Sequence, residues 1–295
     1  MQSLSQILLL MRPKQWVKNT FIFFPLIFSG NIFHPHLLQN SFRAFVGFCL
    51  VSSSMYILND LFDRKRDRLH PKKSSRPLAK KEMKGSLVGF IIFVTMAAGL
   101  LICHTTSRLI FFAALVYIAI HLAYNLYTKS VVILDVIFIA FGFHIRIWAG
   151  SIAAEALPSV WLQMCVFLLA LFLGFTKRRY EISTLKEHAA EHRSVLGHYT
   201  SYLLDQIIII CSTLAITFYG LYTISSEIMG RVGGYNMVYS IAFVIYGIFR
   251  YLYLVHVKKL GDDPGEVLFS DPPMLINVVL WIGYVGLLVY LPRFN

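Results

Sequence analysis

Residues 59–76 read Asn-Asp-Leu-Phe-Asp-Arg-Lys-Arg-Asp-Arg-Leu-His-Pro-Lys-Lys-Ser-Ser-Arg, and this charged stretch separates two apolar runs. One run begins near residue 41 and the other near residue 86. Asp60, Asp63 and Asp67 are spaced i, i+3 and i+7, so a helix would carry all three on one face. Asn59, four residues before Asp63, can join that face. The stretch therefore predicts an apolar helix that ends in a polar, acidic face.

The composition indicates an integral membrane protein. Of the 295 residues, 57% are hydrophobic and only 14% are charged, and the mean hydropathy is +0.64. Soluble domains have about a quarter charged residues. Apolar runs that reach the length of about 20 residues needed to cross a bilayer occur at 19–38, 41–62, 86–105, 108–127, 131–153, 159–178, 204–225, 235–256 and 273–291. We predict an all-α polytopic membrane protein with nine transmembrane helices, and one domain over residues 1–295, since no linker divides the chain.

The distribution of the basic residues predicts the orientation. The net charge is +12, and ten Lys or Arg lie between Arg64 and Lys84 alone. With nine spans, all the strongly basic loops fall on one side, which the positive-inside rule makes the cytoplasm. We therefore expect a multi-pass protein of the inner membrane with its active site on the cytoplasmic side. Because the cations flank apolar spans, the lipid bilayer and phosphorylated substrates are favoured as partners, and nucleic acid is not. The oligomeric state stays open, a homo-oligomer included.

The acidic face predicts a magnesium site. Carboxylate and amide oxygens are the ligands that Mg²⁺ prefers, and nearby cations can hold a polyphosphate. The candidate metal ligands are Asn59, Asp60, Asp63 and Asp67. Lys73 and Arg76, in the loop that follows, are candidates for phosphate binding. The alternative is a solvated basic loop with acidic residues scattered in it.

Further cations occur at helix ends and within one span. Lys14 and Lys18, four residues apart, would either hold a phosphate or anchor the chain on anionic lipid. Arg146 lies eleven residues after Asp135, close to three helical turns, so both share a face of the span 131–153. A buried charge costs at least about 2.5–3.5 kcal/mol. Arg146 should therefore line a wet cavity or pair with a carboxylate. Lys129 precedes the same span.

Two charged segments remain near the predicted cytoplasmic face. Lys177 and Arg178 end the span 159–178 and are candidates for phosphate binding, although Lys177 could form a surface pair with Glu181. An acidic loop holds Asp262, Asp263 and Glu266. These three could bind a second metal or only order the loop. The four cysteines lie within apolar runs and lack metal-ligand spacing, so we interpret them as buried apolar side chains.

Taken together, these segments resemble the UbiA superfamily of membrane prenyltransferases. Asn59-Asp60-x-x-Asp63-x-x-x-Asp67 is similar to its first Asp-rich motif, and nine helices match its fold. Within the superfamily the chain is most similar to the decaprenyl-phosphate phosphoribosyltransferases. That similarity rests on Arg12-Pro13-Lys14-Gln15-Trp16-Val17-Lys18-Asn19, His70-Pro71, Arg76-Pro77, Asp135-Val136, Gly142-Phe143 with Arg146, Lys177-Arg178-Arg179 and Asp263-Pro264 to Asp271. A second acidic motif, Asp-x-x-x-Asp, is replaced after residue 176 by Lys-Arg-Arg-Tyr-Glu, which weakens an assignment as an aromatic prenyltransferase.

The resemblance implies transfer of phosphoribose from 5-phosphoribosyl 1-diphosphate to a polyprenyl phosphate, with release of diphosphate and dependence on Mg²⁺. The expected catalytic residues are Asp60, Asp63, Lys129 and Arg146. The expected phosphate-binding residues are Lys14, Lys18, Asn59, Lys73, Arg76, Lys129, Arg146, Lys177 and Arg178. We expect these groups to converge on one water-filled cavity open to the cytoplasm. The alternatives are transfer of an isoprenyl group to an aromatic acceptor, and a lipid-phosphate transporter without chemistry.

Overall fold

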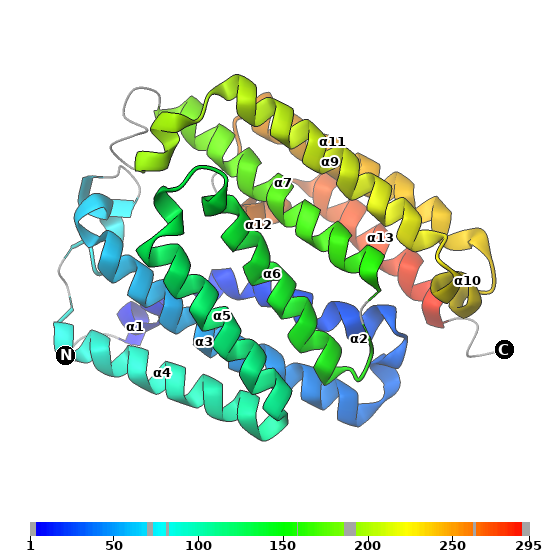
Figure 1. Cartoon of the computed structure of the whole chain (residues 1–295), viewed down its shortest axis with the longest axis horizontal. Helices are drawn as coiled ribbons and strands as arrows, with labels where there is room; N and C mark the ends of the chain where they lie inside the picture. The colour runs from blue at the N-terminus through cyan, green and yellow to red at the C-terminus, as the bar shows by residue number, and fades with distance from the viewer. Residues whose placement is uncertain are drawn as a thin grey trace.

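The computed structural model describes residues 4–69, 73–80, 83–157, 159–185, 193–261 and 264–290, and every regular element in these ranges is helical (Figure 1). The α-helices are α1 (Leu4–Met11), α2 (Phe24–Phe28), α3 (Pro35–Leu69), α4 (Gly85–Thr106), α5 (Arg108–Leu126), α6 (Leu134–Ala153), α7 (Val160–Leu185), α9 (Ser201–Thr223), α10 (Ser226–Val232), α11 (Ile241–His256), α12 (Pro264–Ser270) and α13 (Pro272–Tyr290). The 3₁₀-helices are η1 (Pro13–Phe23), η2 (Asn31–Phe33), η3 (Lys73–Ser75), η4 (Thr128–Ser130), η6 (Ser194–His198) and η7 (Tyr235–Ser240).

Eight helical segments in the described ranges are long and apolar enough to cross a membrane. They are Pro35–Lys65, Gly85–Thr106, Arg108–Leu126, Leu134–Ala153, Val160–Leu185, Ser201–Thr223, Tyr235–His256 and Pro272–Tyr290. Large apolar side chains such as Phe93 and Leu280 are exposed on their outer faces. Lipid can cover such faces, whereas water would leave them as large apolar patches. The prediction of an all-α multi-pass membrane protein is confirmed.

The first predicted span, residues 19–38, is not a continuous helix. It is divided among η1, the five-residue α2, the short η2 and the start of α3. Arg12, just before η1, contacts Asp60 near the charged end of α3, and Asn31 donates to the carbonyl of Ala154, just after α6. Helix α6 covers about 30 Å, so this broken segment runs between opposite ends of the bundle. The predicted count of nine transmembrane helices is therefore not confirmed. The described residues contain eight helices that could cross a membrane and one interrupted segment.

Close backbone approach fixes the broken segment against α6. A Cβ atom at Gly150 would lie 2.0 Å from the carbonyl oxygen of Ile22, so only glycine allows this contact. Small residues of this kind let membrane segments pack closely. On α3, Ser53 accepts a hydrogen bond from Trp16 at 3.0 Å, which holds η1 from its other side. The segment that contains Lys18 and Asn19 is thereby positioned between α3 and α6.

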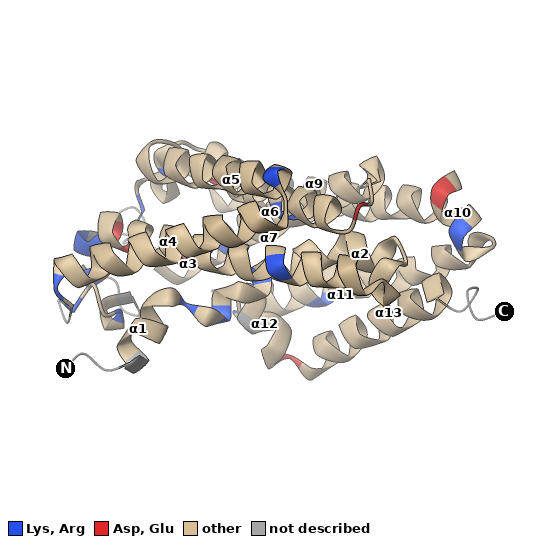
Figure 2. Cartoon of the chain, turned by 90° about the horizontal axis from the view of Figure 1, so that it is seen from below, with Lys and Arg blue, Asp and Glu red and all other residues tan. Residues whose placement is uncertain are grey.

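The helices form two groups around a shared interior (Figure 1). Helices α3–α6 pack around a core that includes Phe48 and Tyr117, and α7, α9 and α11 pack around a second core that includes Phe172 and Tyr251. Contacts between α6 and α7 join the two groups. In Figure 2 the long helices are largely free of charge, and basic residues gather where α3 ends. The basic residues are thus concentrated at one end of the bundle, while the long helices are largely uncharged.

Candidate active site

A cavity of about 1030 Å³ lies inside the bundle between the two groups of helices. Along α7 its lining changes from Leu162, Cys165 and Val166 to Lys177 and Arg178, over about 23 Å from Leu162 to Lys177 at 1.5 Å per residue. The basic residues on its wall are Arg12, Lys18, Arg76, Arg146, Lys177, Arg178 and Arg193. The cavity is therefore shaped for an amphiphile with an anionic head and an apolar tail.

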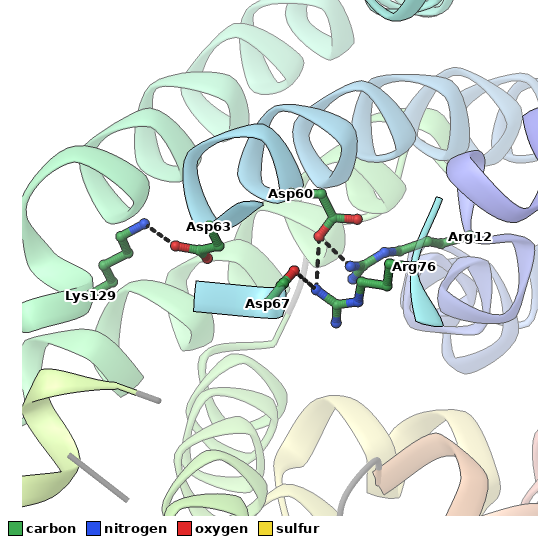
Figure 3. Close-up of polar contacts among 6 residues, drawn as sticks. All are labelled: Arg12, Asp60, Asp63, Asp67, Arg76 and Lys129. Atoms are coloured by element: carbon green, nitrogen blue, oxygen red, sulfur yellow. Dashed lines mark hydrogen bonds and ion pairs between the residues drawn. The ribbon is translucent and has the colours of Figure 1, made fainter. Parts of the chain in front are cut away.

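At the charged end of α3, two aspartates share one arginine (Figure 3). Nη1 of Arg76 lies 2.9 Å from Oδ1 of Asp60 and 2.6 Å from Oδ2 of Asp67, and Arg12 also donates to Asp60. Both aspartates are buried, whereas the two arginines come from segments outside α3 and line the cavity. The sequence identified the aspartates and Arg76, but it did not identify Arg12 as a binding residue.

Asp63 points to a different partner, Lys129 of η4, whose Nζ lies 2.8 Å from its Oδ1 (Figure 3). Neither residue is on the cavity wall, whereas Asn59, one turn earlier on α3, is. The structure thus brings Asp63 and Lys129 together but places Arg146 apart from them, on α6. The groups expected to converge that do line the cavity are Lys18, Asn59, Arg76, Arg146, Lys177 and Arg178.

The acidic end of α3 has the chemistry of a site for a hard cation. In the described part of the chain, no three His, Cys, Asp or Glu side chains converge as metal ligands. Asp60 and Asp67 nevertheless already share one cationic nitrogen, Nη1 of Arg76. A divalent ion bound by oxygen ligands suits the same position. The carboxylates therefore fit a metal that takes the place of the arginine contacts.

Arg146 is buried among uncharged partners. Its Nε donates to Oδ1 of Asn19 at 2.6 Å, Nη1 to the carbonyl of Gly142 at 2.7 Å and Nη2 to the hydroxyl of Tyr117 at 2.8 Å. Its Cζ also lies 4.8 Å from the centre of the Tyr117 ring, and the residue is 3% exposed. No carboxylate of the described residues pairs with it, so this cation on the cavity wall is left to be neutralised by an anion.

The groups that hold Arg146 were missed by sequence reasoning. Nδ2 of Asn19 donates to Oγ of Ser52 at 3.1 Å, which orients its oxygen toward Arg146. The ring of Tyr117 contacts that of His121 at a tilt of 50°, with ring centres 4.2 Å apart, and His121 lines the cavity. A signal was present, because Tyr117, His121 and Asn125 are spaced i, i+4 and i+8 on an otherwise apolar helix.

At the end of α7, adjacent cations have separate roles. Arg178 is 2% exposed and its Nε donates to Oδ2 of Asp135 at 2.7 Å, so Asp135 does not pair with Arg146 on its own helix. Arg179 pairs instead with Asp205 of α9 at 2.8 Å and is not on the cavity wall. Lys177 and Arg178 both line the cavity. Asp135 thus forms a buried ion pair with Arg178, whereas Arg146 lines the cavity without a carboxylate partner among the described residues.

The remaining predicted residues line the cavity, are exposed or lie outside the described residues. Lys18 lines the cavity and Lys14 is exposed. Asp262, Asp263 and the side chains of Glu266 and Lys73 lie outside the described residues. After that acidic loop, Asp271 forms a two-point contact with Arg250, with distances of 2.8–3.2 Å. Hydrogen bonds from Arg250 lower the pKa of Asp271, so this carboxylate serves an ion pair in the described structure.

The fold and the site define an α-helical membrane protein with a cavity for an anionic amphiphile. The model of the UbiA prenyltransferase family matches residues 20–269, and the chain belongs to this family, as its Asp-rich motif predicted. A decaprenyl-phosphate phosphoribosyltransferase of Mycolicibacterium smegmatis is 29% identical over 95% of this chain and 91% of its own length. One of Corynebacterium glutamicum is 29% identical over 95% of this chain and 86% of its own length.

Solved structures agree on the fold. A UbiA homologue from Archaeoglobus fulgidus, solved with GPP and Mg²⁺ bound, aligns with a TM-score of 0.73. The alignment covers 96% of this chain and 99% of that protein, at 20% sequence identity. At that identity the likeness shows the arrangement of helices. It confirms the predicted UbiA-like bundle.

Proposed function

We propose that this chain is a membrane glycosyltransferase that moves phosphoribose from 5-phosphoribosyl 1-diphosphate to a polyprenyl phosphate and releases diphosphate. The two decaprenyl-phosphate phosphoribosyltransferases, which align with nearly the whole chain, support this assignment. We assign residues 1–295 to one UbiA-like domain in the inner membrane, with the charged end of the cavity at the cytoplasmic side. The basic loops support this orientation through the positive-inside rule.

The observation that carries the proposal is the buried, uncompensated guanidinium of Arg146 on the cavity wall. Its three hydrogen-bond acceptors are all neutral. Leaving a buried cation without an anion is unfavourable, and a bound phosphate group would provide the missing charge. The apolar lining from Leu162 to Val166 accommodates an isoprenoid tail beyond that phosphate. An amphiphilic phosphate substrate accounts for both features.

The reaction needs little from the protein beyond positioning and charge stabilisation. An oxygen of the lipid phosphate bonds to C1 of the ribose while the bond from C1 to diphosphate breaks, and its electron pair leaves with the diphosphate. The lipid phosphate is already ionised at neutral pH, so no strong general base is required. Cations such as Lys18 and Arg76 would stabilise the negative charge that moves onto the leaving group.

We assign Mg²⁺ to the acidic end of α3, where Asn59, Asp60, Asp63 and Asp67 would hold it. When bound there, the ion would neutralise charge on the diphosphate group. Arg12, Arg76 and Lys129, which now contact these carboxylates, would then be free to contact the donor's phosphates. This exchange explains why acidic side chains and basic loops meet at one place.

The test is an assay of membranes that contain the protein, supplied with radiolabelled 5-phosphoribosyl 1-diphosphate and polyprenyl phosphate. We expect label to enter the lipid fraction in a Mg²⁺-dependent manner. Label that stays water-soluble, while an aromatic acceptor becomes prenylated, would overturn the assignment in favour of a prenyltransferase.

A single substitution separates an enzyme from a transporter. Asp63→Asn should abolish turnover while the protein still inserts and folds, because it removes a proposed metal ligand. Glu227→Gln is the matched control, since the exposed Glu227 pairs only with Arg231 on α10 in the described structure. Retained lipid-phosphate transport in Asp63→Asn, with no transfer in any variant, would favour the transporter.

A further inference from the structure

Two arginines on the cavity wall are held by one buried carboxylate. Asp135 is 0% exposed, and its Oδ2 accepts from Nε of Arg178 at 2.7 Å. Nη1 of Arg193, which comes from the segment before η6, lies 3.8 Å from the same oxygen. Both arginines line the cavity beside Lys177. Segments that are distant in the sequence thus direct cations to one place.

The carboxylate itself is held by Tyr199. The Tyr199 hydroxyl donates to Oδ1 of Asp135 at 2.8 Å and accepts from the backbone N–H of Ile133 at 2.6 Å. Burial and the adjacent carboxylate raise the pKa of Tyr199, so the hydroxyl stays protonated and remains a donor. Ile133 has φ of 70°, a strained value for a β-branched residue, and its contact with Tyr199 stabilises that turn. Asp135 therefore has a fixed position.

These contacts leave hydrogen-bonding capacity on the cations. Nη1 of Arg193 makes no hydrogen bond within the described residues. Arg178 uses Nε for Asp135 and Nη1 for Oε2 of Glu181, at 2.8 Å. Arg178 and Arg193 thus share the carboxylate of Asp135, and Arg193 keeps an N–H donor that no described residue uses. Guanidinium groups bind phosphate oxygens directly, without a bridging metal.

We propose that Arg178 and Arg193, held by Asp135, form an anion subsite that binds a phosphate monoester without a metal ion, with Tyr199 as its positioning residue. This inference rests on the proposed function, because that function supplies two such groups: the 5-phosphate of the donor and the phosphate of the lipid. The subsite is separate from the acidic end of α3, where phosphate binding would require Mg²⁺.

The experiment measures binding to the purified full-length protein in detergent with EDTA present. The probes are ribose 5-phosphate, which stands for the donor's 5-phosphate, and farnesyl phosphate, which stands for the lipid phosphate. We expect one probe to bind the wild type without metal, and Arg193→Gln to weaken that binding at least about tenfold, as expected for loss of a charged hydrogen bond. Arg179→Gln is the control, because Arg179 pairs with Asp205 away from the cavity.

The two probes identify the source of the phosphate. A selective loss of ribose 5-phosphate binding assigns the subsite to the donor, and a selective loss of farnesyl phosphate binding assigns it to the acceptor. Tyr199→Phe should raise KM for the same substrate in the transfer assay while kcat stays within about twofold of wild type. A purely structural role would lower the melting temperature and leave KM unchanged.

Other outcomes overturn the proposal or separate it from the proposed function. If neither probe binds wild type in EDTA, or if Arg193→Gln binds like Arg179→Gln, there is no such subsite, whether or not the wild type transfers phosphoribose. If a probe binds through Arg193 while the wild type transfers no phosphoribose, the subsite stands and the proposed function fails.

Discussion

The charged end of α3 and the junction of α6 with α7 both combine aspartate with arginine, but in different proportions. At the end of α3, Asp60, Asp63 and Asp67 each contact a cation from another segment (Figure 3). At the junction, the single carboxylate of Asp135 serves Arg178 and Arg193. The first region thus matches three carboxylates with three cations, whereas in the second one buried aspartate holds two arginines.

Under the proposed function, this difference corresponds to two ways of binding phosphate. At the end of α3 the cations lie in loops and short 3₁₀-helices, so a metal ion can replace them on the carboxylates. At the junction Asp135 is fixed by Tyr199 and buried, so its arginines stay in place as permanent cations. We expect loss of the buried carboxylate of Asp135 to affect folding first, and substitutions at the end of α3 to affect turnover first.

The largest effect should follow from Asp135→Asn. Removing one member of a buried ion pair costs about 3–5 kcal/mol, because Arg178 would lose its fully buried partner and keep only Glu181, whose side chain is partly exposed. Unfolding of the purified protein, followed against denaturant in detergent, measures this loss. Asp205→Asn, which removes the exposed partner of Arg179, should change stability by no more than about 1 kcal/mol. Equal losses in both variants would contradict the view that the junction is the rigid region.

Asp60→Asn should lower kcat by about 10²–10³-fold, the range found when one stabilising electrostatic group is removed from an active site. Because Arg12 and Arg76 remain partly exposed, the folded protein should persist. Single-turnover transfer assays and the Mg²⁺ concentration for half-maximal rate measure the effect. A normal rate with an unchanged Mg²⁺ requirement would remove Asp60 from the site and break the contrast between the two regions.

Tyr117→Phe should produce a smaller loss, on the order of tenfold in kcat/KM. The variant removes one hydrogen bond to a charged group, worth about 1.5 kcal/mol, and keeps the ring that lies 4.8 Å from Arg146. Tyr284→Phe serves as a control, because the hydroxyl of Tyr284 contacts only the carbonyl of Asn236 among the described residues and lies off the cavity wall. Matching kinetics in the two variants would show that Arg146 does not depend on Tyr117.

The smallest effect concerns Asp271 and its dependence on pH. Because Arg250 lowers the pKa of Asp271 in the folded protein, the pair stabilises the fold above the unfolded value of about 4. That contribution is lost as pH falls through the lowered folded pKa. Between pH 5 and pH 3 the melting temperature should fall slightly more in wild type than in Asp271→Asn. Identical pH profiles would show that the pair contributes nothing to stability.

Much of the fold could be predicted from the sequence, because membrane helices are long apolar runs and the basic loops mark one side. Residues 19–38 were the exception. Apolar composition gives the length of a membrane segment, but it does not reveal whether that segment is one continuous α-helix. Here Ile22 lies in a 3₁₀-helix and is in close contact with Gly150 of α6. Local spacing likewise placed Asp60, Asp63 and Asp67 on one helix end, because three residues on one helix keep a fixed relation.

The sequence alone thus determined the family, the membrane architecture and the acidic helix end, since each depends on residues near one another in the chain. The tertiary structure decided the partners. Arg146 binds Asn19 and Tyr117 rather than a carboxylate, and Asp135 binds Arg178 and Tyr199 rather than Arg146. These pairs join residues from 29 to 127 positions apart. Such contacts depend on how whole helices pack, and no local spacing encodes that.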